Sequence, residues 1–506
     1  CMVQESRIKY TIKNAWIGAT SQIASFLLAF VVRTVFVYTL GNEYLSINGL
    51  FTNILTVLSF AELGIGASIV FSLYEPIAKN DYQKIGKLLN LFRKAYNYVA
   101  LTIAIIGLSI IPFLKYIITD INNIGNIGEL YLLFLLNTVA SYIWGYKKSF
   151  LIACQKNYVV LLIHLGILIF QSVLQIGVLY LTHNFILFLC VMILSTVANN
   201  ITTTLYVNRH YAHLREYETF ILEKEERIGI FDNIKSIILY KIGGVILNGT
   251  NNIVISAFLK TTLVGLTSNY LLIINSVGSL INQSVSGIAA SIGNYNVSAT
   301  SDDNYRIFRQ LNLISFWLFG FICMGLQFCL NPFIEIWLGQ DYILSDSVVL
   351  SIVVGFYVMI VNSIPSSYRT AMGLFRQTKW YPLCAALANL TLSILFAHYW
   401  GIAGVFWATA LSRMLFYNIV DSYYALKYGM KISPVEFYKT TIVQLIFVCT
   451  IYLICFAITV TVKLNGFHRL LFSIVLVTIL YNSAFWFCFR RNPVFKQALS
   501  RLMRRA

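Results

Sequence analysis

Long apolar runs separated by short polar and charged segments follow one another along the chain. A helix needs about 20 predominantly apolar residues to cross the hydrocarbon core of a membrane, and runs of that length recur from end to end. The pattern predicts an all-α, polytopic membrane protein with about fourteen transmembrane helices. The expected spans are residues 14–38, 48–73, 93–117, 129–151, 158–180, 184–207, 234–258, 262–292, 309–333, 345–370, 380–398, 402–425, 438–462 and 468–489.

The basic residues give the orientation. Most of the 37 Lys and Arg residues fall in the polar segments that share one side of the membrane if both termini are cytoplasmic. The exceptions at the outer side are Lys115, Lys260, Lys463 and Arg469. Because cytoplasmic loops carry the excess of Lys and Arg, we expect a multi-pass membrane protein with both termini in the cytoplasm. The net charge of +17 is then explained by topology and contact with anionic lipids, so nucleic-acid binding is not expected.

A weak internal repeat indicates two related halves. The sequence GIGASI at residues 64–69 returns as GIAASI at residues 287–292, and Tyr146-Lys147 returns as Tyr368-Arg369. These matches and others keep their order along the chain. Each copy would hold six helices, an even number, so both copies would share one orientation, as in transporters built from parallel repeats.

The repeat predicts the domain organisation. The expected parts are an N-terminal lobe at 1–207, a solvated cytoplasmic linker at 208–233, a C-terminal lobe at 234–427, two further helices at 428–489 and a basic cytoplasmic tail at 490–506.

Ionisable residues inside predicted spans are costly and normally face a bundle interior or a wet cavity. Glu62 lies in such a span, and Lys241 is the basic residue predicted at the best matching depth. We therefore expect a Glu62–Lys241 pair between the two lobes. A purely structural carboxylate or a site for a coupling ion are alternatives for Glu62. Arg33 is predicted nearer the outer side, where its side chain could instead reach the headgroups.

Uncharged polar residues are dense in the seventh and eighth predicted spans. They suit a cavity for a neutral, hydroxyl-rich ligand, because amides both donate to and accept from hydroxyls. Such residues also join helices to one another in lipid, and this alternative stays open. The amides that we expect to line the substrate pathway are Asn248, Asn251, Asn252, Asn269 and Asn275.

Basic residues stand at equivalent cytoplasmic positions in the two halves. Lys147, Lys148 and Arg369 could capture an anionic headgroup such as a diphosphate through charge-assisted hydrogen bonds. The alternative is that they only reflect the positive-inside rule.

Composition excludes several other classes. The chain is 58% hydrophobic and 11% charged, whereas soluble domains carry about 25% charged residues. The nine cysteines and six histidines show no zinc-binding spacing, and no phosphate-binding glycine loop is found. We expect no enzyme activity, no metal and no cofactor, and no cleavable signal peptide.

Residues 33–76, RTVFVYTLGNEYLSINGLFTNILTVLSFAELGIGASIVFSLYEP, resemble the polysaccharide-transporter family of bacterial repeat-unit flippases. That family belongs to the multidrug/oligosaccharidyl-lipid/polysaccharide exporter superfamily, and the plan of six, six and two helices extends the resemblance over the whole chain. Arg33 and Glu62 fall on the family's motif, and Lys241 falls only on the cavity-lining first helix of the second lobe.

The resemblance implies a two-lobed, V-shaped helical bundle of the bacterial cytoplasmic membrane that works by alternating access. Its substrate would be an undecaprenyl-diphosphate-linked oligosaccharide, moved to the outer leaflet for capsule, exopolysaccharide or O-antigen synthesis. Membrane lipids and, among assembly proteins, a polysaccharide polymerase are the implied partners.

Three other classes fit the sequence less well. A multidrug extruder of the same superfamily would usually have twelve helices and a cavity richer in carboxylates. A sugar-chain polymerase would need a sizeable outer loop, and a major-facilitator carrier would have a glycine-rich, charged loop in place of YEPIAKNDYQKIGK.

Overall fold

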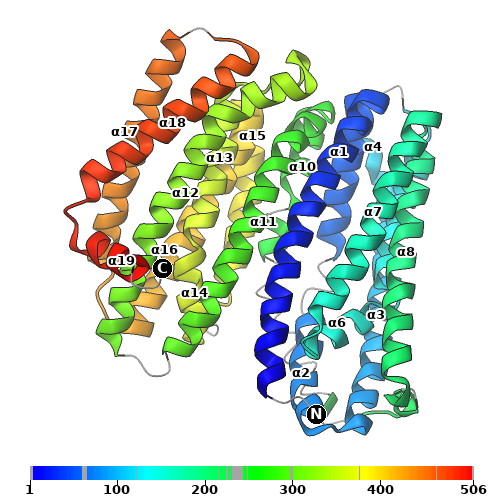
Figure 1. Cartoon of the computed structure of the whole chain (residues 1–506). Coiled ribbons are helices and arrows are strands. Elements are labelled where there is room, and N and C mark those ends of the chain that lie inside the picture. Colours follow the sequence, from blue (N-terminus) through cyan, green and yellow to red (C-terminus); the bar gives the residue numbers. More distant parts are fainter. Residues whose placement is uncertain are drawn as a thin grey trace. The chain divides into compact units, whose positions relative to one another are not determined.

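The computed structural model describes residues 4–503 except 60–64, 122–123, 215, 224–225, 228–229, 231–242, 248, 297–299, 375–376 and 463. Within these residues the chain is helical and contains no strand, which confirms the predicted all-α class (Figure 1). The α-helices are α1 (Gln4–Leu58), α2 (Ile65–Lys79), α3 (Tyr82–Ile110), α4 (Leu114–Ile117), α5 (Ile127–Tyr142), α6 (Gly145–Ala153), α7 (Asn157–Thr182), α8 (Phe185–His210), α10 (Asn251–Phe258), α11 (Thr262–Asn296), α12 (Ser301–Leu338), α13 (Asp346–Val361), α14 (Ser363–Ala371), α15 (Tyr381–Arg413), α16 (Ile419–Tyr424), α17 (Val435–Thr461), α18 (Gly466–Phe489) and α19 (Pro493–Met503).

Ten helices of the described chain are long and apolar enough to cross a membrane, or eleven if the bent pair α5 and α6 counts as one span. The protein is therefore a multi-pass membrane protein. The sequence predicts about fourteen spans, and part of the difference from this number arises at two glycines. Gly41 breaks α1 (φ 80°) and Gly401 breaks α15 (φ 58°). Each continuous helix therefore holds parts of two predicted spans, joined by a left-handed residue that glycine adopts without strain.

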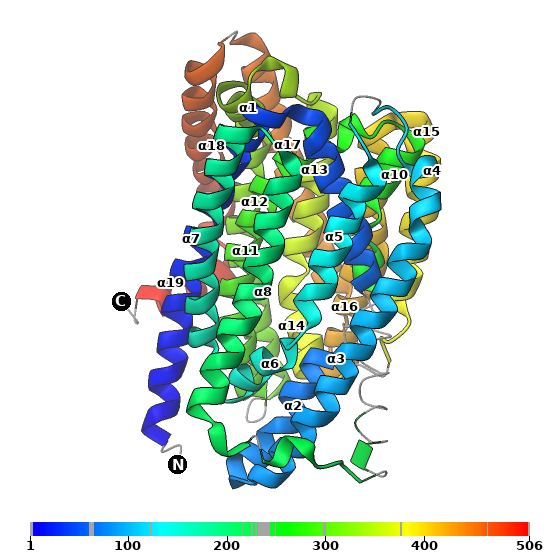
Figure 2. The same ribbon diagram turned by 90° about the vertical axis from the view of Figure 1, so that its right-hand side faces the viewer.

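The predicted span 129–151 is broken in the structure. Helix α5 ends at Tyr142, Trp144 takes a left-handed conformation (φ 62°), and α6 continues at an angle of 41° (Figure 2). The predicted span 234–258 lies partly outside the described residues, which include its last eight residues as α10.

The chain divides into two compact units, unit 1 at Cys1–Ser268 and unit 2 at Asn269–Ala506. The described residues of 243–268, which the repeat assigns to the second lobe, thus belong by their contacts to unit 1. The two predicted lobes and their boundaries remain predictions.

Unit 1 packs α1 against α7, and α7 against α8 (Figures 1 and 2). Its core includes Phe51 of α1, whose ring meets those of Tyr131 and Phe134 of α5 edge-on at centroid distances of 5.2 and 5.6 Å. Edge-to-face pairs of this kind stabilise a core beyond the area that they bury. This packing holds α5 against α1 up to the bend that follows Tyr142.

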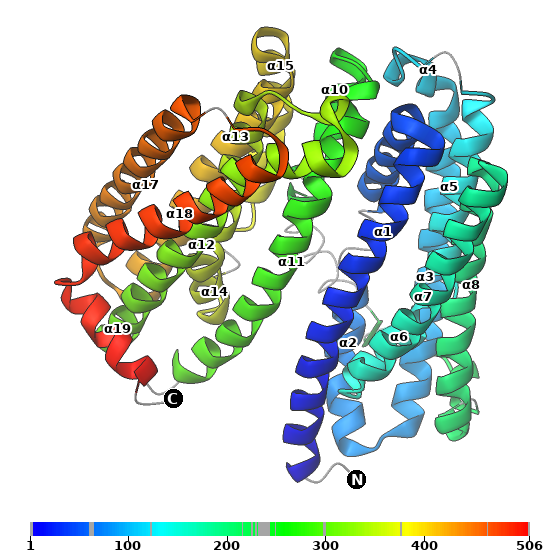
Figure 3. The same ribbon diagram turned by 45° about the horizontal axis from the view of Figure 1, so that its top comes forward.

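In unit 2, α17 and α18 are attached to the rest of the unit along α12 (Figures 1 and 3). A side chain at Gly320 would collide with the hydroxyl of Tyr481, so glycine permits the close approach of α18. Trp317 Nε1 donates to Asn482 Oδ1 at 3.0 Å. Apolar packing around Met324, Cys455 and Tyr481 completes the contact.

The segment after α8, which the sequence predicts to be a solvated linker, is mostly exposed in its described residues but has two buried leucines. Leu214 and Leu222 are buried, and Asn90 Nδ2 donates to the carbonyl of Phe220 at 2.9 Å. We call the described residues of 211–223 the strap. Leu214, Leu222 and Glu218 attach the strap to the rest of unit 1. The charged composition of the strap gives no sign of this packing.

Candidate functional site

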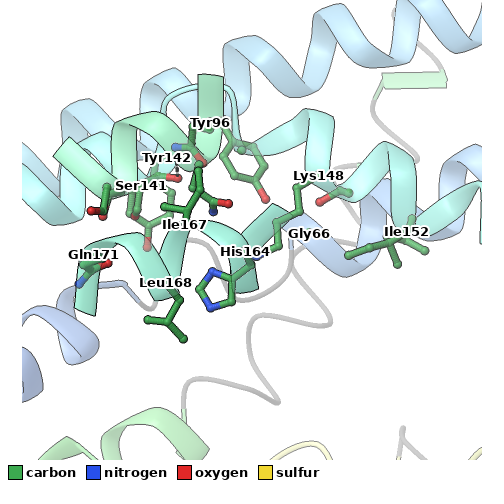
Figure 4. A pocket seen from close by; sticks show the side chains of 17 residues that line it. Gly66, Tyr96, Ser141, Tyr142, Lys148, Ile152, His164, Ile167, Leu168 and Gln171 are labelled. Atoms are coloured by element: carbon green, nitrogen blue, oxygen red, sulfur yellow. Dashed lines mark hydrogen bonds between the residues drawn. The ribbon is translucent and has the colours of Figure 1, made fainter. Parts of the chain in front are cut away.

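A cavity of about 570 Å³ opens inside unit 1, between α2, α3, α5, α6, α7 and α8 (Figure 4). Most of its lining side chains are uncharged hydrogen-bonding groups. The lining residues are Gly66, Val70, Tyr96, Ser141, Tyr142, Gly145, Lys148, Ser149, Ile152, His164, Ile167, Leu168, Gln171, Ser195, Thr196, Asn199 and Asn200.

The charge of this cavity is its most informative property. Lys148 extends from α6 toward the ring of His164 on α7, and the hydroxyl of Tyr96 faces the same space (Figure 4). None of the described lining residues is an aspartate or a glutamate. The described lining residues therefore offer one ammonium group, one imidazole and several amides and hydroxyls, a set that favours an anionic ligand rich in hydroxyls.

The bend between α5 and α6 shapes one wall of the cavity. Asn200 Nδ2 on α8 lies 3.0, 3.2 and 2.9 Å from the carbonyl oxygens of Ala140, Ser141 and Ile143. A break inside a membrane leaves carbonyls without helical partners, and these must be satisfied within the protein. Asn200 does this from the neighbouring helix.

The adjacent residue, Asn199, differs from Asn200 in its hydrogen bonding. Its Oδ1 is buried and has no hydrogen-bond partner among the described residues, although the side chain lines the cavity. A buried unsatisfied acceptor is costly, and a hydroxyl of a bound ligand would remove that cost.

Tyr96 lies against the start of α6. A Cβ at Gly145 would lie 2.9 Å from Cε1 of Tyr96, too close for a side chain. Glycine at this position therefore lets the tyrosine ring reach the cavity wall beside Lys148.

The structure gives protein partners to two of the three cations predicted at the cytoplasmic ends. Lys147 is buried and forms an ion pair with Glu218 of the strap. Arg369 is also buried, and its Nε lies 2.7 Å from Asp421 Oδ1. Only Lys148 of the three lines the cavity of unit 1. A ligand-binding role for Lys147 and Arg369 stays a prediction. Each of these charges already has a counter-ion within the protein.

Asp421 is a residue that sequence reasoning does not single out. Besides Arg369, it accepts from Asn362 Nδ2 at 2.7 Å and from the hydroxyl of Tyr381 at 2.8 Å. It lies on α16, between the π-helical segments Met414–Asn418 and Ala425–Met430. π-Helical turns are frequent at functional sites. The sequence does carry a signal for Asp421. It lies inside the predicted span 402–425, where an ionisable residue is costly and normally has a partner.

The other predicted site residues do not form one cluster. Asn252 and Asn269 are buried, whereas Asn275 is exposed on α11. Asn251 and Arg33 are partly buried and both make polar or electrostatic interactions. The expected Glu62–Lys241 pair and Asn248 lie outside the described residues. Their roles stay predictions.

A hydrogen-bonded junction, which we call the Asp120 clamp, attaches Thr261 and Thr262 of the predicted second lobe to unit 1. Asp120 Oδ1 accepts from the backbone N–H of Thr261 at 2.7 Å and of Thr262 at 3.3 Å. The hydroxyl of Thr262 donates to Asp120 Oδ2 at 2.5 Å. Asn42 Nδ2 donates to the carbonyl of Thr262 at 2.8 Å. By the predicted topology, this junction lies at the outer end of the helices.

The described residues contain no group of three or more His, Cys, Asp or Glu side chains that could hold a metal ion. No known protein family and no curated protein matches the sequence of the chain.

The fold is similar to those of solved membrane transporters. An inward-facing multidrug resistance MATE family transporter of the MOP superfamily superposes with a TM-score of 0.62 and 13% identity, over 82% of this chain and 98% of that chain. The lipid II flippase MurJ, in an inward closed conformation, gives a TM-score of 0.64 and 16% identity, over 96% of this chain and 99% of that chain. A mutant of the MATE transporter VcmN of Vibrio cholerae gives 0.55 and 14%, over 85% and 98%. The chain therefore has the fold that MOP-superfamily transporters and the lipid II flippase share.

Proposed function

We propose that this protein is a flippase that moves lipid-linked oligosaccharides from the inner to the outer leaflet by alternating access, with undecaprenyl diphosphate as the lipid carrier. Capsule, exopolysaccharide or O-antigen synthesis would use the product. The proposal rests on the sequence resemblance, on the shared fold and above all on the charge of the cavity in unit 1.

That charge supports an anionic substrate over a cationic one. A carboxylate in the lining would favour a cationic drug, because complementary charge contributes to which ligands are admitted. The cavity presents Lys148 and His164, and no acidic side chain is among its described lining residues. A diphosphate would accept charge-assisted hydrogen bonds from Lys148, and sugar hydroxyls would pair with Gln171, Asn199 and the neighbouring hydroxyl groups.

The wider superposition with the lipid II flippase supports the same proposal. The MurJ superposition covers 96% of this chain, and the two MATE superpositions cover 82% and 85%. A flippase for a lipid-linked substrate must also accommodate a long apolar tail, and α17 and α18 would supply apolar surface beside it. A cation-coupled multidrug extruder of the same fold is the second candidate.

The position of the cavity fits loading from the cytoplasmic leaflet. Lys148, His164 and Asn200 all stand near the ends of spans that the sequence predicts to be cytoplasmic. The headgroup would enter there while the prenyl tail stays in lipid. Release on the other side would require the Asp120 clamp to open.

The test uses a host whose only repeat-unit flippase has been replaced by this protein. An impermeant sugar-binding probe on spheroplasts measures the lipid-linked oligosaccharide in the outer leaflet. We expect label with the wild-type chain and a loss of about tenfold for Lys148→Gln, since a charge-assisted hydrogen bond is worth about a tenfold change or more.

Lys94→Gln is the matched control, because Lys94 is exposed on α3 and does not line the cavity. Equal label for both variants would remove Lys148 from the proposed site. Absence of label with the wild-type chain, together with efflux of a small organic cation, would favour the multidrug extruder.

A further inference from the structure

A second cavity, of about 410 Å³, lies in unit 2 where α17 and α18 meet α12 and the start of α13. By the predicted topology it lies at the outer side of the membrane. Its polar lining residues are Gln327, Asn331, Asp346, Thr459, Asn465, Arg469 and Ser473, and Phe328, Pro332, Phe456, Val460, Val462 and Leu464 complete it.

Two hydrogen-bond acceptors at this cavity lack their usual donors within the described part of the chain. Gln327 is only 8% exposed, and its Oε1 has no partner among the described residues. Pro332 stands inside α12 and has no N–H, so the carbonyl of Phe328, four residues earlier, loses its helical donor. Both positions line the cavity. Such acceptors require a ligand that donates hydrogen bonds.

Two opposite charges also line this space. Asp346, at the start of α13, is exposed, and one of its oxygens accepts from Asn331 Nδ2 at 2.7 Å. Arg469 of α18 is half-buried. The ion pairs found among the described residues of unit 2 join other side chains. A ligand that carries both a donor cation and an anion would satisfy both charges.

We propose that this cavity binds the headgroup of a zwitterionic phospholipid of the outer leaflet, with phosphoethanolamine as its chemistry. The phosphate lies at Arg469, where the guanidinium supplies charge-assisted hydrogen bonds. The ammonium lies among Asp346, Gln327 Oε1 and the carbonyl of Phe328. The cavity volume is within the range of small-ligand sites, about 300 to 1,000 Å³.

The surroundings fit a ligand with acyl chains. Phe456 and Val460 line the cavity and also expose 42% and 58% of their surface on α17. The acyl chains would run along this apolar surface of α17. A bound lipid would thereby join α17 and α18 to α12 at the end of the helices that holds the cavity.

The acceptors also set the specificity. An ammonium of phosphatidylethanolamine donates three hydrogen bonds, as a lysine ammonium does, whereas the trimethylammonium of phosphatidylcholine donates none. Phosphatidylglycerol has the same phosphate and hydroxyl groups that donate, but it has no cation to place beside Asp346. Phosphatidylethanolamine is therefore expected to bind better than either phosphatidylcholine or phosphatidylglycerol.

Native mass spectrometry of the purified full chain in detergent tests this, with equimolar amounts of the three lipids carrying identical acyl chains. We expect about tenfold more retained phosphatidylethanolamine than phosphatidylcholine. Gln327→Leu, which keeps the volume and removes the acceptor, should reduce that preference. Arg469→Gln should lower phosphatidylethanolamine retention about tenfold.

Arg491→Gln is the control, because it removes the same charge from an exposed position just beyond the other end of α18. Unchanged melting temperatures verify that the variants are folded. Equal retention of the three lipids, or equal loss in Arg469→Gln and Arg491→Gln, would overturn the proposal. Glycerophosphoethanolamine at the same concentration should not compete, and displacement by it would assign the cavity to a soluble ligand instead of a lipid. No outcome depends on transport, so this test is separate from that of the flippase.

Discussion

Arg369 and Asp421 form an ion pair in which the two side chains are 1% and 0% exposed, with Nε and Oδ1 2.7 Å apart. Asn362 and Tyr381 donate to the same carboxylate, and Thr378 accepts from the guanidinium at 3.1 Å. The charges are thus compensated by each other and by neutral groups that hold them in place. The pair ties α14 to α16.

Breaking this pair should be costly. Asp421→Asn leaves the Arg369 charge buried without its counter-ion, so we expect the free energy of unfolding to fall by about 3 to 5 kcal/mol. Chemical denaturation in detergent micelles measures this. The double variant Arg369→Met with Asp421→Leu should recover much of the loss, because no charge then remains buried. Glu75→Gln disrupts the exposed Glu75–Lys79 pair and should have little effect. An equal effect of Asp421→Asn and Glu75→Gln would contradict the assignment.

Gly86 is where the strap rests on α3. A Cβ at Gly86 would lie 2.6 Å from the carbonyl carbon of Tyr217, so Gly86→Ala should lift the strap. If the substitution lowers the free energy of opening the strap by about 1 to 2 kcal/mol, the population with an open strap rises about 5- to 30-fold. The rate of proteolysis follows that population. Chymotrypsin cleavage near Tyr217 and Phe220 measures it. Gly166→Ala on α7 has nothing within 4 Å of the added carbon and should leave the rate unchanged. The same rate in both variants would show that the strap does not depend on Gly86.

The Asp120 clamp should be visible by hydrogen exchange. Asp120→Ala removes the acceptor for the amides of Thr261 and Thr262, at the start of α11, which corresponds to the loss of a helix cap worth about 1 kcal/mol. Peptides covering the start of α11 should exchange about fivefold faster. Asp341→Ala, which removes an exposed carboxylate in unit 2, serves as the control. Unchanged exchange in Asp120→Ala would mean that other bonds hold this junction.

Substitutions at two adjacent residues, Asn199 and Asn200, should separate an effect on stability from an effect on transport. Asn200→Ala removes the donor that faces three carbonyls at the α5–α6 bend, so the melting temperature should fall, with a cost of about 1 to 3 kcal/mol. Asn199→Ala removes an acceptor that has no partner among the described residues, so stability should stay the same or rise while the outer-leaflet label falls. The pair is measured by thermal unfolding and by the leaflet assay together. A stable Asn199→Ala with full transport would remove Asn199 from the proposed substrate site.

The sequence predicts the helical membrane class well, because apolar length is a property of each segment by itself. The breaks at Gly41 and Gly401 are harder to place, since a glycine inside a helix is common and only its backbone angles reveal the kink. Trp144 gives no such signal at all, because a left-handed tryptophan is rare and nothing in its sequence neighbourhood marks it.

The candidate site was only partly predictable. Lys147, Lys148 and Arg369 look alike in the sequence, and their positions near cytoplasmic ends are equivalent. What distinguishes them is partners distant in the chain, Glu218 for Lys147 and Asp421 for Arg369. The polar cavity gathers one to four residues from each of six helices. Each of them is ordinary in its own segment, so no local pattern marks them as a set.

The attachment of α17 and α18 through α12 has a consequence for how this chain can be built and changed. The surface of α12 beneath them is mostly aromatic and aliphatic, with Phe316, Met324 and Phe328 among its residues, and such a surface is as compatible with acyl chains as with protein. The two helices therefore behave as an appended module. Their gain or loss during evolution would leave the remaining bundle compatible with the bilayer, and Trp317 Nε1, which donates to Asn482 of α18, would lose its partner.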